Sequence, residues 1–137
     1  MKNKLLILPA ILMTVLFSAF SVMGQEGRKI TAVVNKAEWC PVCQANGGKI
    51  MTEVIPVFNQ SNVHFVMNDL SNDATKADSK MMLEKAKVYA AVKKTTATGL
   101  ILLVDESTGK LVGKISVAES TEKLIEMIKK VSMQTSM

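Results

Sequence analysis

The chain has 137 residues, with 17 Lys and Arg against 12 Asp and Glu and a formal net charge of +5 at pH 7. Its one Trp, one Tyr and four Phe form no cluster with basic side chains, which argues against a nucleic-acid partner. Without Lys2 and Lys4 the formal charge falls from +5 to +3, so part of the basicity belongs to the N-terminal segment.

Residues 1–24 have the order of a secretory signal peptide: a basic start, an apolar stretch over residues 5–22, and small residues near a cut. Val22 and Gly24 suit the cleavage site, so the expected new N-terminus is Gln25; a cut near Ser21 is a weaker option. An uncleaved membrane anchor is the alternative, because the apolar stretch approaches the length of a membrane-spanning helix. Both interpretations place the rest of the chain outside the cytoplasm, in the periplasm or another extracytoplasmic space.

Residues 25–137 are enough for one compact domain, which we expect to be a monomer, and leave little room for a second domain. The two cysteines, Cys40 and Cys43, form a single Cys-x-x-Cys unit. A disulfide this short constrains the unfolded chain little and joins no distant parts of a fold. The pair is therefore better explained by chemistry than by stability.

The first half of the domain predicts strand, helix, strand. Lys29–Asn35 is a β-branched run typical of a buried strand, and a helix is expected from Cys40 to about Phe58. A kink is expected at Asn46-Gly47-Gly48, because two glycines cost about 2 kcal/mol relative to alanine in a helix. Pro56 is expected to bend or end the last turn, and Val63–Met67 predicts the second strand.

The second half predicts helix, strand, strand, helix. Ala74 to about Lys94 is rich in helix formers. Leu100–Val104 and Leu111–Ile115 flank a turn and predict a hairpin, and Ser120 suits the cap of a last helix. The expected buried positions of the two helices are Ala77, Met81, Val88 and Val92 in the first, and Leu124, Ile125, Ile128 and Val131 in the second.

The resulting order is β-α-β-α-β-β-α. Helical crossovers favour parallel pairing and a hairpin requires antiparallel pairing, so we expect an α/β fold with a mixed four-stranded sheet and helices on both faces. The cysteine pair follows the first strand and begins the first helix. Unpaired N–H groups and the helix dipole at that position favour a thiolate at Cys40. Cys43, one turn further in and expected to be more buried, would resolve a mixed disulfide.

The segment Ala37-Glu38-Trp39-Cys40-Pro41-Val42-Cys43 resembles the active-site segment of the thioredoxin superfamily, and the element order from Ile30 to Val131 is similar to that of its core. The resemblance implies a thioredoxin-like fold and a thiol-disulfide oxidoreductase without a cofactor. It also implies substrates among cysteine-containing exported proteins and a membrane-borne electron donor. By this resemblance, the catalytic residues would be Cys40 and Cys43. The residues that bind the substrate would be Trp39, Pro41, Val42, Thr98 and Gly99.

The chain departs from the family pattern at two places. Val34 stands where the family usually has a buried acid, which would leave Cys43 without that proton acceptor. Thr98-Gly99 stands where a cis-proline usually precedes the third strand, so we expect a trans peptide and a more open site. The dipeptide Pro41-Val42 places no side-chain donor beside the thiolate, and we expect a potential toward the reducing part of the range of about −270 to −120 mV.

The alternative function is a Cu(I)-binding or redox-silent interaction domain with the same fold. Two thiolates and the distant His64 do not complete a closed metal site, so no metal is expected at the site as a resident group. His64 is interpreted as solvent-facing or satisfied in the core, and the methionines Met81, Met82 and Met127 as core filling. Solvated surface is expected for the lysines at positions 76, 80, 85, 87, 93 and 94.

Overall fold

The computed structural model describes residues 27–134. The predicted signal segment and its cut before Gln25 lie outside the described residues. Within residues 27–134 no helix combines the length and apolar character that crossing a membrane requires.

Four strands form one mixed sheet in the order β2-β1-β3-β4. The strands are β1 (Ile30–Lys36), β2 (Val63–Asp69), β3 (Leu100–Asp105) and β4 (Lys110–Ser116). Strand β1 pairs in parallel with β2 and antiparallel with β3, and β3 pairs antiparallel with β4. The central strands β1 and β3 are buried along almost their whole length, as their apolar runs predict. The predicted order of strands along the chain and the mixed pairing are confirmed.

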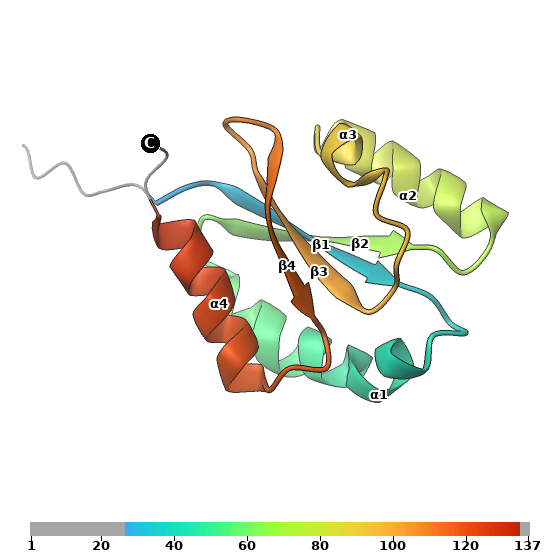
Figure 1. Cartoon of the computed structure of the whole chain (residues 1–137), viewed down its shortest axis with the longest axis horizontal. Coiled ribbons are helices and arrows are strands. Elements are labelled where there is room, and N and C mark those ends of the chain that lie inside the picture. Colours follow the sequence, from blue (N-terminus) through green and yellow to red (C-terminus); the bar gives the residue numbers. More distant parts are fainter. Residues whose placement is uncertain (1–26, 135–137) are drawn as a thin grey trace, which may run out of the picture.

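Helices cover both faces of the sheet, as predicted (Figure 1). One face carries α1 (Pro41–Lys49) with its continuations η1 (Ile50–Val54) and η2 (Ile55–Phe58), and also α4 (Thr121–Met133). The opposite face carries α2 (Asp73–Lys85) and the short α3 (Tyr89–Val92).

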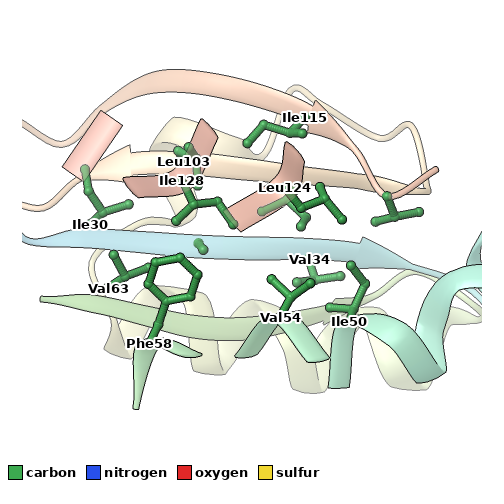
Figure 2. Close-up of a cluster of buried hydrophobic side chains, with 13 residues drawn as sticks. Ile30, Val34, Ile50, Val54, Phe58, Val63, Leu103, Ile115, Leu124 and Ile128 are labelled. Atoms are coloured by element: carbon green, nitrogen blue, oxygen red, sulfur yellow. The ribbon is translucent and has the colours of Figure 1, made fainter. Parts of the chain in front are cut away.

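The larger core lies between the sheet and the pair formed by α1–η2 and α4 (Figure 2). Ile50, Val54 and Phe58 project from the first helical segment, and Leu124 and Ile128 project from α4 toward the same strands. All five side chains are buried. The apolar stripe expected in the last helix is thus confirmed, and Ser120 caps it by accepting a hydrogen bond from Lys123 N.

The expected kink at Asn46-Gly47-Gly48 is wrong. Helix α1 runs through both glycines to Lys49, and the irregularity begins directly after it, at Ile50, as a π turn (η1) followed by a 3₁₀ turn (η2). Pro56 explains the shift, because it has no N–H to continue the α-helical pattern. The extra residue of the π turn keeps Ile50 and Phe58 on the core side.

The second predicted helix is shorter than expected and buries other residues. Helix α2 ends at Lys85, and Lys87 adopts a left-handed conformation with φ 60° before α3 begins. Ala77 and Met81 are exposed, and α2 instead buries Ser79 and Leu83. No glycine marks this break, because a lysine takes the left-handed position that glycine usually occupies. Val88 and Val92 are buried as predicted.

Candidate redox site

The cysteine pair lies at the junction between β1 and α1. Cys40 is the N-cap of α1 and forms a disulfide with Cys43, with their Cα atoms 5.2 Å apart. Pro41 occupies the first turn, where its missing N–H costs no hydrogen bond. Cys43 N donates to Cys40 Sγ at 3.3 Å, and no acidic residue stands in the first turn. This position therefore favours negative charge on the Cys40 sulfur.

The expected burial of the two cysteines is reversed. Cys40 is only 3% exposed, whereas Cys43 is partly exposed. Cys43 lines a cavity beneath α1 that Cys40 does not line. In the disulfide form, the cysteine expected to attack is therefore the more buried one, and burial does not support the roles that the sequence position indicates.

A network of buried amides holds the loop before β3 against β1. Asn35 is fully buried, and its Nδ2 donates to Thr95 O at 2.9 Å and to Ala97 O at 3.1 Å. Its Oδ1 accepts a hydrogen bond from Asn68 Nδ2 at 2.8 Å. Its backbone carbonyl accepts from Gly99 N at 2.8 Å. The side chain and the carbonyl of Asn35 together thus fix the path of residues 95–99.

This loop packs directly on the redox motif. Gly99 has φ +76° and is buried, and a Cβ at this position would overlap Cγ1 of Val42. The described residues contain no cis peptide bond, so the predicted trans peptide at Thr98-Gly99 is confirmed. The expectation of a more open site there is wrong, because the missing side chain at Gly99 lets the loop approach Val42 closely instead.

The loop leading to Cys40 is fastened to the end of β2. Ser71 Oγ accepts a hydrogen bond from Glu38 N at 2.8 Å, and Ser71 O accepts one from Trp39 Nε1 at 3.2 Å. Ser71 in turn donates to Asp69, which also forms an ion pair with Lys36 at 3.2 Å. The indole of Trp39 stays 61% exposed beside the pair.

The carboxylate of Asp69 accepts hydrogen bonds from Ser71 and pairs with Lys36, so its charge contributes to holding this loop. Burial acts to raise the pKa of Asp69, but hydrogen bonds from Ser71 and the charge of Lys36 outweigh it and hold the pKa below its usual value. The ionised carboxylate therefore stabilises the folded state near neutral pH.

The cavity beside Cys43 has a volume of about 410 Å³. Its apolar lining includes Val34, Ile50 and Met67. Val34 is the residue that stands where the resemblance led us to look for a buried acid. Glu38 and Lys36 also line it, so charged groups accompany the apolar wall. Its size falls within the range of small-molecule and side-chain binding sites.

The strand order and the position of the cysteine pair decide the fold. A parallel β1-α1-β2 crossover and an antiparallel β3-β4 hairpin share one sheet, and the pair begins the crossover helix. The chain has a thioredoxin-like fold.

Comparison with known proteins finds similar chains among solved structures only. Trxlp from Edwardsiella tarda EIB202 is 17% identical, with 74% of this chain and 84% of that chain covered and a TM-score of 0.46. Thioredoxin f2 of Chlamydomonas reinhardtii is 14% identical, with 81% and 86% covered and a TM-score of 0.48. No protein-family model matches the sequence, and a search of curated proteins finds no match.

The other candidate residues lie away from the pair. His64 pairs in register with Thr31 near the start of β1, at the opposite end of the strand from Cys40, and its exposed ring contacts Glu106 at 3.3 Å. Across residues 27–134, no three His, Cys, Asp or Glu side chains gather into a possible metal site. Met81 and Met82 are exposed, so their assignment to the core is wrong, whereas Met127 packs against the core. All six lysines expected on the surface are exposed.

Sequence reasoning missed Asn35, Asn68 and Ser71, which position the loops on either side of the pair. A signal for Asn35 was present, because an amide at the end of a buried β-branched strand needs hydrogen-bond partners. Asn68 and Ser71 carry no such signal, because polar residues at the end of a strand also suit an ordinary turn.

Proposed function

We propose that the chain is a thiol-disulfide oxidoreductase that reduces or exchanges disulfides in exported, cysteine-containing proteins through Cys40 and Cys43. The observation that carries the proposal is the disulfide at the N-terminus of α1, where Cys40 Sγ accepts a backbone hydrogen bond. Two sulfurs that open and close one disulfide carry two electrons, so the reaction needs no further cofactor.

The reaction begins with the reduced pair. The Cys40 thiolate attacks one sulfur of a substrate disulfide, a mixed disulfide forms, and the other substrate sulfur leaves as a thiolate that takes up a proton. Cys43 then loses its proton and attacks the Cys40 sulfur. The Cys40–Cys43 disulfide forms, the second substrate thiolate leaves, and the substrate has gained two electrons and two protons.

Cys40 is assigned the attacking role although it is 3% exposed in the disulfide form. A thiolate is stabilised only where positive potential meets it, and that place is the N-cap of α1. Reduction breaks the bond to Cys43 and frees the Cys40 side chain to rotate, which brings its sulfur within reach of a partner.

The surface around Cys40 is proposed to receive the substrate. Trp39 offers a large exposed ring, and Pro41 is exposed at the helix start. Val42 lies against Gly99, and the neighbouring Thr98 is half-buried. Exposed aromatic side chains next to a reactive group are typical of contact surfaces. Gly99 N donates a hydrogen bond to Asn35 O, and Gly99 O accepts one from Val117 N, which holds this edge in place.

Reductase activity requires a donor that restores the two thiols, and we propose a membrane-borne dithiol protein outside the cytoplasm. Val42 cannot donate a hydrogen bond from its side chain to the thiolate, which favours a potential toward the reducing part of the range of about −270 to −120 mV. Equilibration of the pair with glutathione measures it. A potential near −120 mV would indicate an oxidase instead.

Trapping tests the roles of the two sulfurs. Cys43→Ser should accumulate mixed disulfides with a protein substrate through Cys40, because the second step is blocked. Cys40→Ser is the matched control and should accumulate almost none. The reverse pattern would show that Cys43 is the attacking sulfur and would overturn the assignment.

A further inference from the structure

The cavity beside Cys43 is not needed for electron transfer between the two sulfurs. Its volume of about 410 Å³ far exceeds what a single sulfur requires, and it lies between α1 and the carboxyl end of β1. A cavity of this size next to a reacting sulfur is suited to holding part of the substrate.

The wall of the cavity selects for apolar groups. Val34 and Ile50 are 5% and 2% exposed and form part of the lining with Met67. An apolar group that displaces water from such a wall gains about 25 cal/mol per Å² of apolar surface buried, whereas an amide or a charge loses its hydrogen bonds to water.

The rim of the cavity has a different character. Lys36, Glu38 and Gln44 contribute to it, and Gln44 already donates to the Glu38 carbonyl. A polar rim around an apolar wall fits a peptide whose side chain enters while its backbone stays at the surface.

The geometry limits which side chain can enter. Cys40 and Cys43 have Cα atoms 5.2 Å apart, and Cys43 lines the cavity. Consecutive residues of a peptide are 3.8 Å apart at Cα. The residue next to a substrate cysteine bonded to Cys40 therefore has the reach to enter the cavity.

From these observations we propose that the cavity binds a large apolar side chain adjacent to the reacting cysteine of the substrate. The inference rests on the proposed function and names the class of its substrates: segments in which a residue such as leucine flanks the cysteine. The chain then selects disulfides by their neighbouring residue as well as by their exposure.

The test uses two short peptides, each carried as a mixed disulfide with cysteamine, that differ only in a leucine or an asparagine beside the cysteine. These side chains have similar shapes, so the comparison isolates polarity. We expect the reduced protein to show a kcat/KM about tenfold higher for the leucine peptide, as is usual for an apolar pocket. Reduction of both peptides at equal kcat/KM would overturn this inference and leave the proposed function standing. Reduction of neither would overturn the proposed function.

Two glycines of α1 supply a matched pair of variants. Gly47 lines the cavity and Gly48 does not, and a Cβ at either meets nothing within 4 Å. Both substitutions to leucine improve helix propensity, so both variants should fold. Gly47→Leu should bring the leucine-to-asparagine ratio close to one by occupying the cavity, and Gly48→Leu should preserve the tenfold ratio. An equal ratio in the two variants would contradict the proposed location.

A rim variant provides an independent check. Met51 lines the cavity but is 55% exposed, so Met51→Glu adds a charge at the mouth without disturbing the core. The preference for leucine should fall several-fold, because the apolar side chain must pass a carboxylate. Met82→Glu, at a similarly exposed position on α2, is the control. An unchanged preference in Met51→Glu would count against the cavity as the binding site.

Discussion

Gly99→Ala should be strongly destabilising, and the structure separates two causes. An L residue in the left-handed region costs about 1–2 kcal/mol, and Gly99 has φ +76°. The new Cβ would also overlap Val42 Cγ1, and overpacking of this kind costs about 1–3 kcal/mol. The expected loss in the free energy of unfolding is therefore about 2–5 kcal/mol.

Gly109→Ala is the matched control. Gly109 has φ +66°, but a Cβ there meets nothing within 4 Å, so only the backbone cost of about 1–2 kcal/mol applies. Urea denaturation measures both variants. In a Val42→Ala background the overlap disappears, and Gly99→Ala should cost no more than Gly109→Ala. An equal cost of Gly99→Ala in both backgrounds would refute the packing of this loop on the redox motif.

Three further predictions concern the surroundings of the pair. Val34→Asp places a carboxylate in the cavity beside Cys43. It should speed resolution of the mixed disulfide near neutral pH and lower the free energy of unfolding, because the buried carboxylate is desolvated. An unchanged rate in stopped-flow measurements would show that another group already accepts the proton of Cys43. Asn35→Ala leaves the carbonyls of Thr95 and Ala97 and the side-chain amide of Asn68 without their partner. It should lower the free energy of unfolding by about 3 kcal/mol and speed amide hydrogen exchange in residues 95–99. Faster exchange only in other residues would contradict this role. The folded pKa of Asp69 lies below its unfolded value, so its contribution is present above the unfolded pKa of about 3.9 and is lost as pH falls through the folded pKa. Asp69→Asn should lose less stability than the parent between about pH 5 and 2, as measured by thermal unfolding, and an identical pH profile would contradict the shift.

The order of the strands along the chain and the mixture of parallel and antiparallel pairing could be predicted from the sequence, because both depend on local pattern. The buried runs at Lys29–Asn35 and Leu100–Val104 lack charges except at their ends, and the turn residues between Val104 and Leu111 require a hairpin. Each predicted strand agrees with the structure within a few residues at its ends.

Helix details could not be predicted, because tertiary contacts outweigh propensity there. The glycines of α1 are tolerated in a helix whose Lys49 Nζ donates to Glu119 O at 2.6 Å, which ties α1 to the loop before α4. Met81 fits an apolar stripe in the sequence, yet α2 packs with Leu83 facing the sheet and Met81 exposed.

The candidate site could be predicted in part. The position of Cys40 at the helix start follows from the chain order, and the structure agrees. The relative burial of Cys40 and Cys43 could not be predicted, because it depends on a cavity whose wall comes from β1, β2 and η1. The supporting amide of Asn35 finds its partners 60 and 62 residues away along the chain, beyond what a local pattern encodes.

The most direct test of the redox function counts electrons. The reduced protein is mixed with a protein disulfide in the absence of other reductants, and the thiols released from the substrate are measured against the Cys40–Cys43 disulfide formed. Two substrate thiols should appear for each disulfide closed, and none should appear with Cys40→Ser. Tight, stoichiometric binding of Cu(I) by the same preparation, with no thiols released, would contradict the account and favour a metal-binding domain.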